Sequence, residues 1–283
     1  MSGSLTLVPT PIGNLGDISP RAIEALRSAD FIAAEDTRVT LKLLNYLQIK
    51  KPLVSYYEHN KVESGAAILL RIQQGENCTL VSDAGSPAIS DPGEDLVRLC
   101  SANGIRVSAI PGPCAAITAL SISGLPTGRF CFEGFLSVNK KSRKAHLESL
   151  KSEERTMIFY EAPHKLRSTL SDLRKTFGDD RRISLCRELT KLHEEVLRFS
   201  LKEAEEYYLS QDPRGEYVLI LNGAEKTAEA VSDEADILSL VHRFMDGGMT
   251  KKDAIRQAAD QTGMAKNAVY ELVIGEESSG KGR

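Results

Sequence analysis

VSDAGSPAISDPG, residues 81–93, separates two apolar segments of different character. Cys78 and Leu80 before it, together with its first residue Val81, indicate the end of a strand, whereas apolar positions at 96–100 recur at helical spacing. The density of Asp, Gly, Ser and Pro in between is incompatible with the interior of a helix or strand. The stretch therefore predicts a strand, an elaborate loop and a helix in succession.

The loop at 81–93 has two interpretations. In an open parallel sheet, ligands bind outside the carboxyl ends of the strands, which makes the loop a candidate ligand site. Alternatively, it is a rigid connection in which aspartates cap the turns. The sequence contains neither a Gly-Lys-Ser/Thr phosphate loop after this strand nor a Gly-x-Gly-x-x-Gly motif, so the common nucleotide-binding signatures are excluded.

Composition places the chain among soluble globular proteins. It has 283 residues, 41% of them hydrophobic and 27% charged, with a net charge of −3. This length allows about two domains, and the charge excludes a simple polybasic binder. The five cysteines include no C-x-x-C pair, which favours buried free thiols over a zinc site or disulfides. From this cysteine pattern we expect no metal. We find neither a signal peptide nor an apolar run of membrane-spanning length, so we expect a cytoplasmic protein.

Strands and helices alternate through residues 1–112. Short strands are predicted at 5–8, 32–34, 53–54, 78–81 and 105–110. Alternation of this kind predicts an α/β fold with a largely parallel sheet. The polar ends of its strands are candidate site loops, above all Glu35-Asp36-Thr37-Arg38, which either begins a helix with favourable acids or forms part of a site.

Residues 113–223 form a second predicted α/β segment. After an Ala-rich helix, strands are predicted at 130–132, 157–160, 183–186, 196–199 and 217–221. Residues 139–151 carry five basic residues against the single acid Glu148. This run is either a solvated helix face or a patch that contacts nucleic-acid phosphates, and the residues alone leave both open.

A separate helical piece follows a polar linker at 224–232. Apolar periodicity predicts three helices within 232–275, with a Gly-containing turn before the third, as in a helix-turn-helix. Acidic residues outnumber basic ones there, which favours RNA or protein docking over DNA reading. We expect the tail, 276–283, to be disordered.

Seven motifs occur in the order and at the spacing of a known family. They are PTPIGNLGD (9–17), AEDTR (34–38), SDAGSPAISDPG (82–93), IPGP (110–113), FEGFL (132–136), YEAPH (160–164) and RELTK (187–191). Over roughly residues 5–275 the chain resembles the bacterial ribosomal RNA small subunit methyltransferase I family, a branch of the tetrapyrrole methylase superfamily.

The resemblance implies two α/β subdomains with S-adenosyl-L-methionine in the cleft between them, in a homodimer. The implied reaction is 2′-O-methylation of a cytidine ribose in the decoding region of 16S ribosomal RNA, within the small ribosomal subunit. The implied cofactor-binding residues are Pro11, Gly13, Asp83, Gly85, Ser86, Cys114, Ala115, Ala162, Leu189, Gly215, Glu216 and Tyr217. Cys114 stands where relatives commonly carry Ser or Thr. With this cofactor, Asp83 is expected to face the ligand and Asp91 to brace the turn into the next helix.

Methylation of a ribose in RNA requires a group that accepts the hydroxyl proton and residues that bind the RNA. A ribose hydroxyl is a poor nucleophile until its proton is removed, so a carboxylate base is expected. We assign this role to Glu35 or Asp36, with Arg38 either orienting the acid or holding a phosphate, although each acid could equally cap the next helix. Lys140, Lys141, Arg143 and Lys144 are the candidate phosphate contacts. The competing functions are a methyltransferase of a tetrapyrrole precursor and a non-enzymatic nucleic-acid-binding protein.

Overall fold

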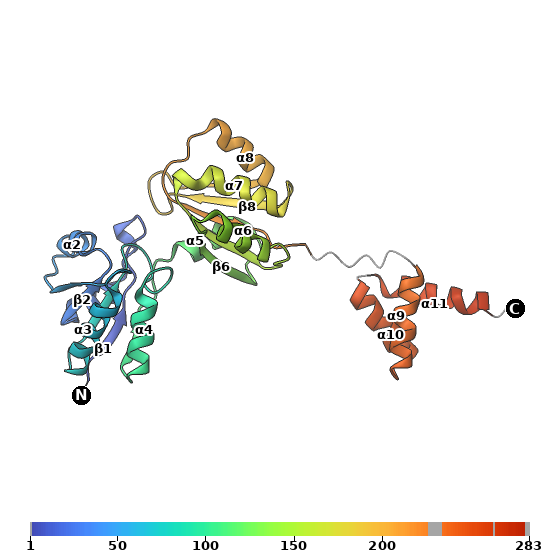
Figure 1. Ribbon diagram of the computed structural model, residues 1–283, viewed down its shortest axis with the longest axis horizontal. Coiled ribbons are helices and arrows are strands. Elements are labelled where there is room, and N and C mark those ends of the chain that lie inside the picture. The colour runs from blue at the N-terminus through green and yellow to red at the C-terminus, as the bar shows by residue number, and fades with distance from the viewer. Residues whose placement is uncertain (1, 226–233, 263, 281–283) are drawn as a thin grey trace. The chain divides into compact units, whose positions relative to one another are not determined.

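The computed structural model describes residues 2–225, 234–262 and 264–280. Two compact units make up the chain, residues 1–223 and 224–283. The first contains two five-stranded sheets with their helices, and the second contains helices α9 to α11 (Figure 1).

The first sheet has the strand order β3-β2-β4-β1-β5, and every neighbouring pair is parallel. Its strands are β1 (Ser4–Leu7), β2 (Phe31–Ala34), β3 (Leu53–Ser55), β4 (Cys78–Val81) and β5 (Arg106–Ala109). The connections contain α1 (Pro20–Ser28), α2 (Thr37–Tyr46), α3 (Lys61–Gln73) and α4 (Gly93–Ala102), with a short 3₁₀ helix η1 (Leu15–Asp17). The α/β fold and the parallel sheet predicted from the sequence are confirmed.

The central strands of this sheet are buried on both faces. Leu5, Phe31 and Leu80 pack in one apolar cluster, whereas Ile32 and Val81 pack in another. Burial on both faces explains why β2 is a short continuous apolar run and why β4 is apolar apart from the buried Thr79. Charged residues follow directly after β2, at Glu35 and Asp36, and soon after β4, at Asp83.

The second sheet is mixed, with the order β6-β7-β10-β8-β9. The pair β6–β7 is parallel, and the other three pairs are antiparallel. Its elements are α5 (Ala115–Ser123), β6 (Phe130–Phe135), α6 (Lys140–Ser149), β7 (Thr156–Glu161), α7 (Pro163–Phe177), β8 (Arg182–Arg187), β9 (Glu195–Ser200), α8 (Leu201–Ser210) and β10 (Tyr217–Leu221). The sequence reading missed α7 and α8.

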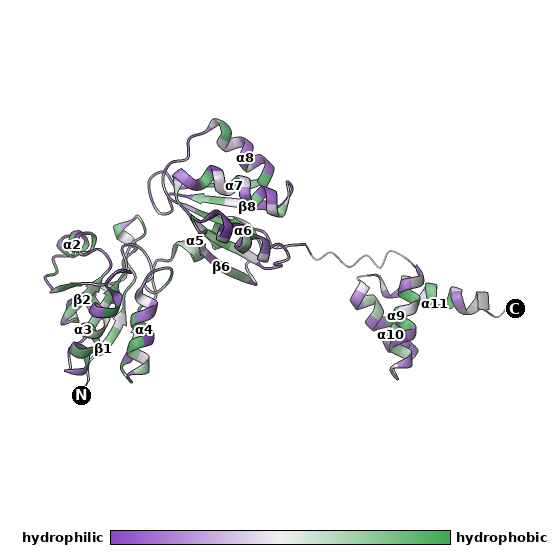
Figure 2. Cartoon of the chain, in the orientation of Figure 1, coloured by the Kyte–Doolittle hydropathy of each residue, from purple (hydrophilic) through white to green (hydrophobic). Residues whose placement is uncertain are grey.

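The helices cover the second sheet unequally. Helices α6, α7 and α8 pack on one face through Leu147, Leu170 and Ala204, while α5 packs on the other through Ala119 and its neighbours. In Figure 2, α7 and α8 carry both hydrophilic and hydrophobic residues, as expected of helices that bury a single face.

The C-terminal unit consists of α9 (Glu234–Asp246), α10 (Lys251–Thr262) and α11 (Lys266–Gly280) around an apolar core that includes Val241, Ala258 and Val269. The predicted linker lies mostly outside the described residues. Residues 276–280, expected to be disordered, are helical, because α11 continues to Gly280; residues 281–283 lie outside the described part. Within the described residues, the helices lack the length and apolarity needed to cross a bilayer.

Candidate cofactor site

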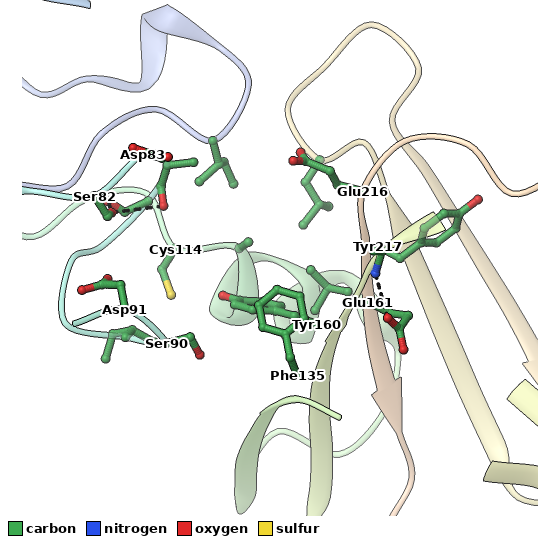
Figure 3. Close-up of a pocket in the computed structure, with 18 of the residues that line it drawn as sticks. Ser82, Asp83, Ser90, Asp91, Cys114, Phe135, Tyr160, Glu161, Glu216 and Tyr217 are labelled. Atoms are coloured by element: carbon green, nitrogen blue, oxygen red, sulfur yellow. Dashed lines mark hydrogen bonds between the residues drawn. The ribbon is translucent and has the colours of Figure 1, made fainter. Parts of the chain in front are cut away.

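A cavity of about 670 Å³ opens between the carboxyl ends of the strands of the first sheet and one end of the strands of the second. Its lining comes from the loops that follow β1, β2, β4, β5 and β8, and from β6, β7 and β10. Figure 3 shows Asp83 and Asp91 on one side, Glu161 and Glu216 on the other, and the rings of Phe135 and Tyr160 between them. A volume of this size accommodates a cofactor of several hundred daltons.

Loops from three strands hold one another at the first-sheet side of the cavity. Thr10 and Gly85 exchange backbone hydrogen bonds of 2.9 and 3.0 Å, and the Ser86 hydroxyl donates to the Pro113 carbonyl at 2.9 Å. Gly85 has a φ of +81°, and a Cβ there would lie 3.2 Å from Ile12. The backbone conformation therefore favours glycine at this position, and a larger residue would also require Ile12 to shift.

The loop at 82–93 is braced by Asp91, as the sequence predicts. Asp91 Oδ1 accepts hydrogen bonds from the backbone N–H of Ala88 at 3.0 Å and of Gly93 at 2.7 Å. Ala88 and Ser90 both have a φ of +67°, which is costly for residues other than glycine. The carboxylate is thus part of what keeps this strained loop in place.

A second strained loop lies on the opposite side of the cavity, after β8. Glu188 and Thr190 have φ values of 53° and 64°, and they flank Leu189, which lines the cavity. Glu188 Oε1 accepts from the Glu216 N–H at 3.0 Å and from Lys191 Nζ at 2.8 Å. Non-glycine residues in this conformation cluster at functional sites, which supports a role for both loops in ligand binding.

The two acidic residues of the Glu-Asp-Thr-Arg segment after β2 lie in different environments. Glu35 lines the cavity, and burial together with the nearby carboxylates of Asp83 and Asp91 raises its pKa. Asp36 is outside the lining; its carboxylate accepts hydrogen bonds from Arg38 Nε at 3.0 Å and Nη2 at 2.6 Å. These hydrogen bonds lower the pKa of Asp36 to about 2, which makes it the weaker base of the two.

Glu161 is a buried carboxylate that sequence reasoning did not select. It ends β7, is 5% exposed and lines the cavity. One oxygen accepts from the Ala162 N–H at 2.9 Å, and the other accepts from the Thr169 hydroxyl. The polar residues after an apolar strand in YEAPH were the available signal, although that pattern alone does not distinguish a site from a helix cap.

Ten of the predicted catalytic and cofactor-binding residues line this one cavity. They are Glu35, Asp83, Gly85, Ser86, Cys114, Ala115, Ala162, Leu189, Glu216 and Tyr217. Five others do not: Pro11, Gly13, Asp36, Arg38 and Gly215.

Two of those five make room for the loop after β8. A Cβ at Gly13 would lie 2.6 Å from Lys191 Cγ, and one at Gly215 would lie 2.5 Å from Glu188 Cγ. These glycines therefore act on the shape of the cavity through the loop that they contact.

The four residues predicted to contact phosphates differ in their exposure to solvent. Lys140, Lys141 and Lys144 are exposed on α6, as an RNA-binding surface requires. Arg143 is 8% exposed; its Nε lies 2.7 Å from Asp172 Oδ2, and its Nη2 donates to Thr169 Oγ1 at 2.9 Å. The prediction for Arg143 needs correction, because a guanidinium buried against α7 cannot reach a phosphate in solution.

The lining has a marked excess of acidic side chains. Glu35, Asp83, Asp91, Glu161 and Glu216 contribute carboxylates, while the lining residues that the structure describes include no Lys or Arg. Such a cavity favours a ligand with positive charge. Within the described residues, those of the cavity included, no cluster of His, Cys, Asp and Glu has an arrangement that could hold a metal ion.

Comparison with known proteins supplies the family. A family model described as tetrapyrrole (corrin/porphyrin) methylases matches residues 4–205. The ribosomal RNA small subunit methyltransferase I of Synechocystis sp. is 46% identical over 278 residues, covering 98% of this chain and 100% of that protein. The chain belongs to this methyltransferase I family. The Pseudomonas aeruginosa member is 44% identical over 275 residues, covering 96% of this chain and 97% of its own.

A solved structure supports the fold independently. Uroporphyrin-III C-methyltransferase from Thermus thermophilus, crystallised with S-adenosylhomocysteine, aligns with a TM-score of 0.54 at 18% identity, covering 78% of this chain and 97% of that one. The resemblance inferred from the seven motifs is confirmed. As a member of the methyltransferase I family, the chain is a methyltransferase that uses S-adenosyl-L-methionine.

The cavity fits the chemistry of that cofactor. S-adenosyl-L-methionine carries a sulfonium and an ammonium cation, which suit the carboxylates of Asp83 and its neighbours, and an adenine ring, which suits the apolar surface of Leu189 and Ala162. Its activated methyl group requires no metal for transfer.

Proposed function

We propose that the protein transfers a methyl group from S-adenosyl-L-methionine to the 2′-oxygen of a cytidine ribose in the decoding region of 16S ribosomal RNA. The observation that carries the proposal is the extent of the likeness. The match to the tetrapyrrole methylase model ends at residue 205, whereas the Synechocystis and Pseudomonas relatives, both named for ribosomal RNA, match 98% and 96% of the chain, helical unit included.

The proposed role of Glu35 is to accept the proton of the ribose hydroxyl. The bond from the 2′-oxygen to the methyl carbon forms as the bond from sulfur to that carbon breaks, and the proton moves to the Glu35 carboxylate. Two observations support this role: the raised pKa makes Glu35 a better proton acceptor than Asp36, and Glu35 lines the cavity that we propose as the cofactor site. Arg38 pairs with Asp36, and both lie outside the cavity lining.

RNA recognition is assigned to the exposed face of α6. Lys140, Lys141 and Lys144 lie close together on one short helix, and the only acid between 139 and 151 is Glu148. Clustered lysines bind the phosphate backbone and make binding dependent on salt. The family resemblance also supports a homodimer that acts in the cytoplasm on the small ribosomal subunit, and light scattering on the purified protein tests the dimer.

The decisive experiment offers three acceptors to the protein with methyl-labelled S-adenosyl-L-methionine. These are assembled small ribosomal subunits, naked 16S RNA and a tetrapyrrole precursor. We expect label in RNA, released by nuclease digestion as 2′-O-methylcytidine. Label in the macrocycle would favour the tetrapyrrole reading, and RNA binding without transfer would favour the non-enzymatic one.

A further inference from the structure

The strand β6 contains one extra residue opposite β7. Phe132 pairs with Ile158 and Phe135 pairs with Tyr160, so three steps along β6 match two steps along β7. The irregularity lies between Phe132 and Gly134, and Gly134 has a φ of +62°. This is a β-bulge, a feature that commonly redirects a side chain next to a functional site.

The bulge turns Phe135 towards the cavity. In a regular strand, residues 132 and 135 would point to opposite faces of the sheet. With the inserted residue, both lie on the face of Ile158 and Tyr160, and both rings contact Tyr160, with centroids 5.1 and 5.4 Å apart. Without it, Phe135 would point to the face of Phe159, among the core residues under α6 and α7.

Phe135 nevertheless remains 59% exposed, although it lines the cavity. Burying a phenylalanine side chain contributes about 1.5–3 kcal/mol, so the bulge places a large apolar surface where folding gains little from it. Figure 3 shows the ring beside Tyr160 and facing the space between the two acidic sides. An aromatic ring held on one side and open on the other is suited to stacking on a planar group.

The positive charge near Phe135 indicates which planar group would stack on the ring. β6 ends at Phe135, and α6 begins five residues later at Lys140, where Lys140, Lys141 and Lys144 are exposed. The same short segment thus presents a ring at the cavity and a cluster of cations beside it. Single nucleotides extruded from RNA are bound by this combination, with the base stacked on an aromatic side chain and the phosphates near basic ones.

We propose that Phe135 stacks on the base of the nucleotide whose ribose is methylated, and so holds the 2′-hydroxyl at the cofactor. This inference rests on the proposed RNA-methylating function. The bulge at 132–134 directs the ring to this position. Glu133 in the bulge forms a hydrogen bond of 2.9 Å with His146 of α6, which connects the bulge to the basic helix.

The test compares Phe135→Ala, Phe135→Tyr and Val138→Ala, the last a control at a 78% exposed apolar position in the same segment. The measurements are kcat and KM with assembled small subunits, and the Kd for S-adenosyl-L-methionine by calorimetry. Loss of one base stack, about 1–3 kcal/mol, predicts a 5- to 150-fold fall in kcat/KM for Phe135→Ala, with the cofactor Kd within about twofold of wild type. Phe135→Tyr retains most of kcat/KM, and Val138→Ala matches wild type.

Two results overturn the inference while the proposed function stands. One is wild-type kcat/KM in Phe135→Ala. The other is an equal loss of cofactor affinity, which would assign the ring to the adenine of the cofactor. If the wild-type protein transfers no methyl group to RNA, the proposed function fails and the inference with it. Thermal melting of each variant excludes misfolding, because an exposed ring contributes little to the core.

Discussion

Arg143 donates a hydrogen bond from Nη2 to Thr169 Oγ1 over 2.9 Å, although both residues are buried and come from different helices. The Thr169 hydroxyl in turn donates to Glu161, and Asp172 pairs with the other side of the guanidinium. A cation is thus provided near a buried carboxylate, whose burial would otherwise be costly. The basic helix is thereby linked to the wall of the cofactor cavity.

Thr169→Val tests how much the hydrogen bonds of Thr169 with Arg143 and Glu161 contribute to stability. Valine keeps the shape but removes the hydroxyl, which leaves Arg143 and Glu161 without a shared partner; the expected loss of unfolding free energy is about 1–3 kcal/mol. Thr169→Ser retains the hydroxyl and should lose less. Urea denaturation of both variants measures the difference. Equal losses would show that packing, rather than the hydrogen bonds, determines the effect.

Arg143 illustrates why the sequence predicts a basic surface but not its members. The run Lys140-Lys141-Ser142-Arg143-Lys144 is uniform in charge, and its composition indicates nothing about which side chain faces α7. The partners that withdraw Arg143 from solvent, Thr169 and Asp172, lie about thirty residues further on, in a helix that the sequence reading missed. Burial of a charged residue is decided by such distant partners, which local patterns do not specify.

Glu35→Gln and Asp36→Asn should separate the two candidate bases. The base form of Glu35 exists above its raised pKa, so single-turnover methylation should fall as pH falls through that value. Glu35→Gln should remove this acid limb and lower the rate about 10²- to 10⁴-fold. Because the pKa of Asp36 is about 2, Asp36→Asn should keep the limb at its original pH.

The thermal stability of Glu35→Gln gives an independent control for the kinetic result. A carboxyl whose pKa is raised by folding favours the folded state when it is protonated, and that contribution is lost as pH rises through the raised pKa. Glu35→Gln should therefore melt no lower than wild type at neutral pH. A melting temperature well below wild type would contradict the environment assigned to Glu35, and the lost rate could then reflect unfolding.

Asp83→Ala and Asp91→Ala are expected to fail in different ways. Asp91 holds the Ala88 and Gly93 N–H groups, so its loss should lower the unfolding free energy by about 0.5–2 kcal/mol, as loss of a helix cap does. Asp83 accepts one backbone hydrogen bond, from Asp36, and faces the cavity, so its loss should mainly weaken cofactor binding. Calorimetric Kd values and urea denaturation test the division; equal loss of affinity in both variants would contradict it.

The strands and helices of the fold were easier to predict from the sequence than the details of the site. Short apolar runs such as Phe31–Ala34 predict parallel strands because burial on both faces leaves no polar positions. The bulge in β6 is different: FEGF contains no strict signature of an inserted residue, and only pairing with β7 reveals that Phe135 faces the cavity. The positive φ values of Ala88 and Glu188 are likewise imposed by their surroundings.

Cys114 provides a test of where the cofactor binds that does not depend on methylation. It is partly exposed and lines the cavity, whereas Cys78 and Cys186 are buried, and burial raises their pKa to about 12 and about 11. The thiolate is the reactive form, so iodoacetamide should modify Cys114 in the native protein while these two react only after unfolding. Saturating S-adenosyl-L-methionine should slow modification of Cys114 at least tenfold, measured by peptide mass spectrometry. Labelling at an unchanged rate in the presence of bound cofactor would place the cofactor away from this cavity.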